Sequence, residues 1–377
     1  MAPRRNKSKN PPIFSHEFVI QNHADIVSCV AMVFVIGLMF QVTSPVATLF
    51  VTMQHNVTLN ESHIDYDPEI GYYSYGRKDI FAVFFYTLIG IVVHAVLQEY
   101  VLDKFNRRMH LSKVKHSKFN ESGQLLAFYF ASAAWGVDII VREGYLMGIS
   151  RLWDNYPHCN FPFVVKFYFI IQIAYWIHTF PELYFQKIKK DEMSSRIQYA
   201  VLYLVFITSA YMLNFNRVAL CMLVLHYTVE FVYHVARLMY FAEKLDLANT
   251  GFMVFNVLFV LVRLGTITLA VLTFWYGLEQ SNKSMFDFAA GNFNTQIIRI
   301  NCLTAICFLQ AWLMWTFITF HLRKLRERSA VATSKKTRSP SKKRTKVQDE
   351  DISSLPEADQ NSATENGNVK QRKGKKV

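Results

Sequence analysis

Four polar side chains recur at helical intervals within one long apolar stretch, residues 218–241. They are His226, Glu230, His234 and Arg237, and intervals of four, four and three place them on one face of a helix. Ionisable groups in a membrane-spanning helix are costly, so this face must point into a helix bundle or a wet cavity. Either the residues bond to neighbouring helices, with Arg237 reaching the cytosolic surface, or they line a polar groove for a substrate or guest helix.

Two further polar residues, His178 and Arg263, lie deep in other apolar stretches and extend the candidate groove. A metal site is not expected, because the position between His226 and His234 on the common face is Glu230 rather than a third histidine. The sequence also has no glycine-rich phosphate loop, nucleophile elbow or metalloprotease box, so we expect no catalytic residue, no metal and no cofactor. The candidate intramembrane polar groove consists of His226, Glu230, His234, Arg237, His178 and Arg263.

The stretches that carry these residues are long enough to span a membrane as helices. Hydrophobic residues make up 52% of the 377 residues and charged residues only 18%, below the quarter that is typical of soluble domains. Runs of about 20 apolar residues cross the hydrocarbon as helices, and these runs lack the alternation of a barrel strand. We therefore expect an all-α integral membrane protein with about eight transmembrane helices. The predicted spans are 27–53, 80–101, 123–142, 162–181, 197–213, 218–241, 251–276 and 297–320.

The short loops differ in positive charge, and this difference predicts the orientation of the chain. Loop 102–118 has six Lys or Arg residues and loop 182–196 has four, whereas loops 54–78 and 278–296 have two and one. Positive loops stay on the cytosolic side. With an even number of spans, both termini are predicted to be cytosolic.

The net charge of +13 is concentrated in the two tails. Residues 1–9 contribute four positive charges, and residues 323–377 contribute nine more from 16 Lys/Arg and 7 Asp/Glu. A folded nucleic-acid-binding face is therefore not indicated. The C-terminal tail has too few apolar residues to fold and is expected to be disordered. Its basic stretch 334–346 could contact anionic lipid or ribosomal RNA.

Two glycosylation sequons fall in the loop predicted to face the lumen. They begin at Asn56 and Asn60, each followed by Thr or Ser two residues later. Both are predicted glycosylation sites.

Several long and rare sequence strings are distributed along the chain: Ser15–Asp25, Val96–Tyr100 with Leu102–Lys104, Lys115–Gln124, Phe180–Lys187 and Gly291–Asn294. They resemble the translocating chain-associated membrane (TRAM) proteins, and the similarity extends from about residue 11 to 327. The resemblance implies a multi-pass protein of the endoplasmic reticulum that lies beside the protein-conducting channel. Its implied partners are that channel, nascent secretory and membrane chains, and membrane lipids, and its implied role is to assist translocation or membrane insertion.

The same resemblance implies a TLC domain and therefore a competing function, the acyl transfer of ceramide synthases. In those enzymes a paired histidine motif follows a lysine-rich stretch, and the pair aligns here with Gln198 and Tyr199. Glutamine cannot titrate and tyrosine is a poor base near neutral pH, so the proton acceptor that the resemblance implies for acyl transfer is lost. We expect a non-enzymatic guide, with a sphingolipid acyltransferase or a lipid-binding regulator as the alternatives.

The chain then divides into four segments. Residues 1–26 form a basic cytosolic segment, and 27–116 hold the first two spans with the glycosylated luminal loop. Residues 117–326 form the TLC domain of six spans, and 327–377 form the disordered tail.

Overall fold

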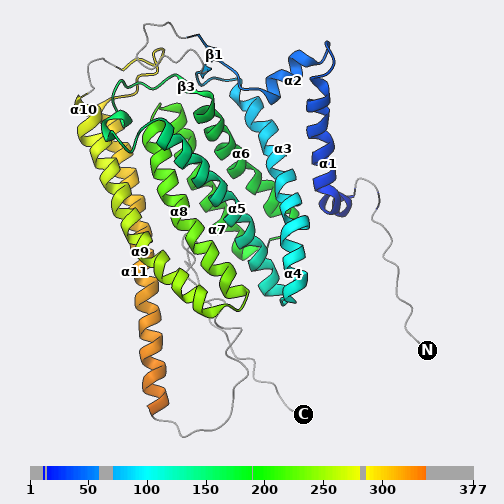
Figure 1. The fold of residues 1–377 in the computed structure, drawn as a ribbon, viewed down its shortest axis with the longest axis vertical. Coiled ribbons are helices and arrows are strands. Elements are labelled where there is room, and N and C mark those ends of the chain that lie inside the picture. Colours follow the sequence, from blue (N-terminus) through cyan, green and yellow to red (C-terminus); the bar gives the residue numbers. More distant parts are fainter. Residues whose placement is uncertain (1–11, 13–14, 59–70, 189, 281–285, 337–377) are drawn as a thin grey trace.

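The structure, a computed structural model, describes residue 12 and residues 15–58, 71–188, 190–280 and 286–336. In this part of the chain, seven helices are long and apolar enough to cross a membrane. They pack side by side into one bundle, as Figure 1 shows. The predicted fold class, an all-α multi-pass membrane protein, is confirmed. Asn60 and the tail beyond residue 336 lie outside the described residues.

The elements follow one another along the chain as helices, and the strands lie in the longer connections before α3 and α6. The α-helices are α1 His16–Gly37, α2 Ser44–Val51, α3 Asp79–Val96, α4 Asp103–Met109, α5 Lys113–Arg142, α6 Phe163–Phe185, α7 Lys190–Met212, α8 Asn216–Phe241, α9 Leu245–Ala270, α10 Leu278–Gln280 and α11 Gln296–Lys336. The π-helices η1 Leu97–Leu102 and η3 Val271–Gly277 continue α3 and α9, η2 Ile149–Leu152 is a 3-10 helix, and the strands are β1 Asn56–Val57, β2 Tyr72–Tyr73 and β3 Phe161–Pro162.

The fifth predicted span, 197–213, lies in α7, which is not among the seven apolar helices. The first turns of α7 carry Lys190, Glu192 and Arg196, which lower its hydropathy. It is nevertheless 23 residues long and packs between α6 and α8. Its place in the bundle therefore depends on its neighbours more than on its own apolar character.

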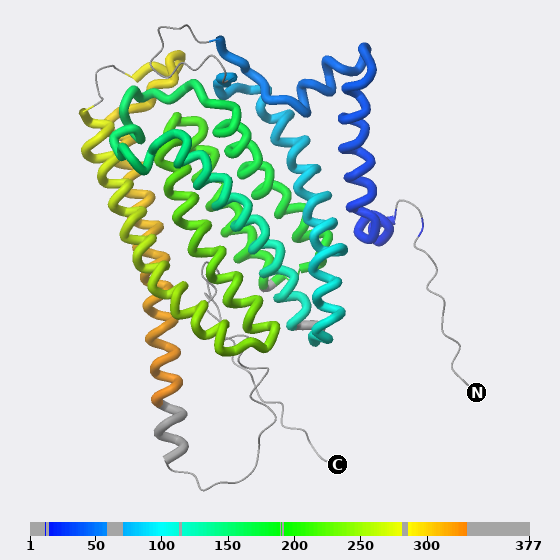
Figure 2. Tube along the Cα trace, viewed as in Figure 1, coloured from blue at the N-terminus to red at the C-terminus, as the bar shows by residue number. Residues whose placement is uncertain are grey.

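The first predicted span, 27–53, is wrong as a single helix. The helix begins earlier, at His16, because the Ser15 side chain accepts the backbone N–H of Phe18 and caps it. It ends at Gly37, where the Thr43 hydroxyl donates to the Gly37 carbonyl at 2.8 Å and the chain turns into α2. Pro45, in the first turn of α2, has no backbone N–H to continue an earlier helix. Figure 2 shows α1 and α2 in blue beside α3, at the edge of the bundle.

Helix α8 lies at the centre of the bundle and packs on both α5 and α9. Small residues bring the helices together: Gly136 of α5 lies against Val224, and Gly251 of α9 lies against Ala236. Tyr227 of α8 is fully buried. Large apolar side chains such as those of Val33, Phe84, Val205, Phe308 and Trp315 remain exposed on the outer helices, as expected for surfaces that face lipid.

A small three-stranded sheet closes one end of the bundle, at the top of Figure 1. The strand order is β1-β2-β3 and both pairs are antiparallel, with Asn56 opposite Tyr73 and Tyr72 opposite Pro162. The sheet thus joins the connection before α3 to the connection before α6.

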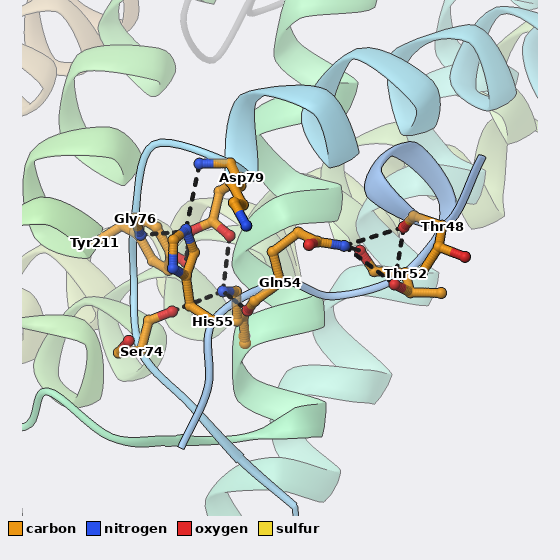
Figure 3. A network of polar contacts seen from close by, with 10 residues as sticks. Thr48, Thr52, Gln54, His55, Ser74, Gly76, Asp79 and Tyr211 are labelled. Atoms are coloured by element: carbon orange, nitrogen blue, oxygen red, sulfur yellow. Dashed lines mark hydrogen bonds and ion pairs between the residues drawn. The ribbon is translucent and has the colours of Figure 1, made fainter. Parts of the chain in front are cut away.

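Beneath this sheet lies a buried ion pair between Lys166 of α6 and Asp79 of α3, with the ammonium 2.7 Å from the carboxylate. Lys166 also donates to the backbone carbonyls of Gln54 and Ser74, at 2.8 and 2.7 Å. Figure 3 shows Asp79 receiving two further donors, the Gly76 amide and the Tyr211 hydroxyl, each at 2.9 Å. The pair therefore fastens the connecting loop to α3, α6 and α7.

We predict that Asp79→Asn destabilises the protein by about 3–5 kcal/mol, because it leaves the Lys166 ammonium buried without its carboxylate. The measurement is the melting temperature of the detergent-solubilised protein. The matched control is Arg77→Ala, at an exposed neighbouring position. Adding Lys166→Met to Asp79→Asn should restore part of the loss, since the charge without a partner is then gone. Equal melting of Asp79→Asn and the control would contradict the structural role of the pair.

Candidate functional site

A recess of about 70 Å³ lies between α7, α8, α9 and α11, and it is open on one side. Its apolar wall comes from leucines, Phe206, Met222 and Ile306. Its polar groups come from all four helices, which are distant in sequence. The polar lining residues are Tyr199 and Tyr203 of α7, His226 of α8, Arg263 and Thr266 of α9, and Gln310 of α11.

The polar lining belongs to a chain of hydrogen bonds that crosses the bundle. It begins on α5, where the Tyr129 and Tyr199 hydroxyls are 2.8 Å apart. The Tyr199 and Tyr203 hydroxyls follow at 3.0 Å, and the Tyr203 hydroxyl bonds to Nε2 of His226. Arg263 of α9 and Gln310 of α11 complete the chain. It therefore links five helices, α5, α7, α8, α9 and α11, at membrane depth.

The Arg263 guanidinium closes the chain on the far side. One terminal nitrogen lies 2.7 Å from Nδ1 of His226, and the other donates to the Gln310 side-chain oxygen at 3.0 Å. The guanidinium also lies over the Phe259 ring, 4.9 Å from its centroid. Arg263 is only 2% exposed. Each of these contacts is with a neutral group.

The contact with Arg263 fixes the hydrogen-bonding state of His226. Arginine only donates, so Nδ1 of His226 must be the acceptor and Nε2 must carry the hydrogen. Nε2 then donates to the Tyr203 hydroxyl oxygen. Both ring nitrogens are engaged, so His226 cannot accept a proton from a substrate unless its bond to Arg263 breaks.

The other members of the predicted α8 face lie elsewhere. Glu230, His234 and Arg237 are buried, at 2%, 3% and 5% exposure, and none of them lines the recess. His234 stacks on the Tyr129 ring at 5.6 Å. Arg237 lies over the Phe241 ring at 5.9 Å, so its side chain remains within the bundle and does not extend to the surface.

His178 of α6 is also buried and does not line the recess. Its ring lies 5.6 Å from that of His94 on α3, and Nε2 of His94 lies 3.7 Å from the Glu182 carboxylate. On the other side of Glu182, His23 of α1 approaches at 3.9 Å and stacks on Phe185. This cluster attaches α1 to α6.

Within the described ranges, no group of three or more His, Cys, Asp or Glu residues could hold a metal ion.

The recess thus contains two of the six predicted groove residues, His226 and Arg263. Sequence reasoning missed Tyr203 and Gln310, although Gln310 is an amide in the middle of an apolar run, a signal that could have identified it. Tyr199, which occupies a position of the histidine pair in the ceramide synthase alignment, lines the recess, whereas Gln198 is exposed. The Asn56 side chain is exposed in β1.

Comparisons with known proteins place these residues in a family context. The family model described as the TLC domain matches residues 118–319, which include every residue of the recess. The chain is 48% identical over 323 residues to translocating chain-associated membrane protein 2 of Homo sapiens, covering 86% of each chain. The Mus musculus protein of the same name is 48% identical over 325 residues, again covering 86% of each chain. A ceramide synthase of Gibberella moniliformis is 25% identical over 197 residues, covering 52% of this chain and 46% of that protein.

Proposed function

Because this chain belongs to the translocating chain-associated membrane protein family and carries a TLC domain, we propose that it assists protein translocation at the endoplasmic reticulum. In this role it contacts signal sequences and transmembrane segments of nascent chains beside the protein-conducting channel. The observation that carries the proposal is the identity of 48% over 86% of both chains with proteins named for association with translocating chains. Contacts with lipid and, through the basic tail, with the ribosome belong to the same proposal.

The geometry of the recess suits such a role. A weakly hydrophobic signal sequence enters lipid poorly, because each polar residue at the helix centre costs up to about 3 kcal/mol. A recess at membrane depth with tyrosine hydroxyls and a guanidinium that His226 holds in place offers hydrogen bonds to such a residue. At about 70 Å³ it admits a side chain, whereas a whole guest helix must lie along its apolar rim.

Acyl transfer, the runner-up function, lacks a suitable base in this site. Tyr199 stands where the resemblance to ceramide synthases implies a histidine, and its hydroxyl is bonded to Tyr129 and Tyr203. The one histidine of the recess, His226, has both nitrogens engaged. We therefore propose that the protein is not an enzyme.

We predict that His226→Leu weakens the contact with weak signal sequences and spares strong ones. The reason is that a polar guest gains hydrogen bonds in the recess, whereas a leucine-rich guest needs none. The measurement is photocrosslinking of matched short polar and long leucine-rich signal sequences in microsomes rebuilt with each variant. The polar guest should lose crosslinks several-fold, and Thr268→Ala, at an exposed position of α9 outside the recess, should behave as the wild type. Equal loss for both guests, or loss for neither, would count against the recess as the contact site.

The orientation of the chain is proposed from loop charge, with the sheet end of the bundle in the lumen and both termini in the cytosol. Asn56 then lies on the side where glycosylation occurs. We predict that Asn56→Gln together with Asn60→Gln removes all glycan from the chain, and that protease added to intact microsomes removes the C-terminal tail. Gel mobility after each treatment is the readout. A tail protected from protease would reverse the proposed orientation.

A further inference from the structure

Arg263 is a buried cation for which the described part of the chain provides no acidic partner. All of its contacts are with neutral groups: Gln310, His226 and the Phe259 ring. A guanidinium has five N–H donors, and Arg263 uses two of them. Its Nε is buried and has no hydrogen-bond partner. An isolated buried charge is costly, and such charges are normally paired or functional.

The contrast with Lys166, another buried cation of the bundle, is informative. Lys166, equally buried, is neutralised by Asp79 at 2.7 Å and by two backbone carbonyls. That cation is part of the structure and needs nothing from outside. Arg263 instead lines an open recess, so a ligand can reach it. Charge complementarity requires that ligand to be an anion, and the planar donor pair of a guanidinium matches a carboxylate.

The depth of Arg263 identifies the source of the carboxylate. The span Leu245–Gln280 is continuous, and Arg263 lies 18 residues after its start and 17 before its end. It therefore lies near the middle of the hydrocarbon, on the order of 15 Å from either surface. The headgroup of a phospholipid or the carboxylate of a fatty acid remains at the surface. A side chain of a membrane-spanning guest helix can lie at the required depth.

The packing of the helices shows how a guest could approach. Helix α7 packs on α6 and α8, whereas α11 packs on α9 and η3, and the recess lies between α7 and α11. The apolar lining from these two helices comes from Leu202 of α7, which is also exposed, and from Ile306 and Leu309 of α11. A guest helix can thus lie against an apolar rim while one of its side chains enters the recess.

We propose that Arg263 binds the carboxylate of an Asp or Glu side chain at the centre of a guest transmembrane segment, and so makes the recess selective for acidic guests. This inference rests on the proposed function and adds the substrate class. A basic guest residue would meet the same guanidinium with like charge and would be rejected. A neutral amide could bond to the recess but would leave the charge of Arg263 uncompensated.

The test compares guest segments of leucine and alanine that differ in one central residue: Asp, Asn, Lys or Leu. A fifth guest carries the Asp two turns from the centre, which tests the depth requirement. A photoreactive probe beside the test residue reports contact in microsomes rebuilt with wild-type protein, Arg263→Gln, Arg263→Lys or Arg323→Gln. Arg323→Gln is the control because this arginine lies exposed on α11, outside the recess. Expression level and elution profile establish that each variant is folded.

With wild-type protein, the central Asp guest should give the strongest crosslink, well above the Asn, Lys, Leu and displaced Asp guests. Arg263→Gln should reduce that crosslink roughly tenfold, which corresponds to about 1.4 kcal/mol, to the level of the Asn guest. Arg263→Lys should retain part of it, and Arg323→Gln should retain all of it. If Arg263→Gln does not fold, the partial retention by Arg263→Lys and the ranking of the guests with wild-type protein still decide the outcome.

Two results would overturn the inference. One is an Asp guest that crosslinks no better than the Asn or Lys guest. The other combines two observations: a photoactivatable fatty acid labels the purified protein in an Arg263-dependent way, and the protein shows no selectivity among the guests. That result would assign the site to a lipid. In either case continued crosslinking of the Leu guest and of weak neutral signals would leave the proposed function intact. Loss of all guest contacts with wild-type protein would instead refute the proposed function itself.

Discussion

The hydrocarbon interior of a membrane offers no water to a charged group, so each buried charge in the bundle must be satisfied by the protein or by a ligand. At one end of the bundle, the Asp79–Lys166 pair satisfies this constraint internally. It also collects the carbonyls of Gln54 and Ser74, the Gly76 amide and the Tyr211 hydroxyl. Three helices and a connecting loop are held in register by this one pair, and the small sheet lies over it.

Near the middle of the bundle the same constraint has a different solution. Arg263 is held by His226, Gln310 and Phe259, which fix its position without neutralising it. The hydrogen-bonded chain from Tyr129 through Tyr203 to His226 supports that arrangement from the opposite side. A rigid and uncompensated guanidinium beside an apolar rim is unsuitable as a structural device, but it suits the recognition of polar guests. The acid–base chemistry of a ceramide synthase would instead need a free imidazole, which His226 does not provide.

The sequence predicts part of this arrangement. Apolar run length identifies most of the helices, and helical spacing correctly places Glu230, His234 and Arg237 on an inward face. The break between α1 and α2 was missed, because it depends on the Ser15 cap, the Thr43 hydroxyl and Pro45 rather than on hydropathy. Lys166 near the start of an apolar run gives no sign of its partner, since Asp79 is 87 positions away. The recess was only partly predicted for the same reason: Tyr203, His226, Arg263 and Gln310 meet through the packing of four helices.

The central claim is that nascent chains meet the protein at the recess between α7 and α11. The most direct measurement uses a photoreactive amino acid at one of two positions: Leu202, on the recess rim, or Val46, on the exposed surface of α2. Each variant is irradiated during synthesis of a secretory protein. The account predicts adducts with the nascent chain from position 202 and few from position 46. Adducts from position 46 with none from position 202 would contradict it, because the nascent chain would then pass the α1–α2 side of the bundle.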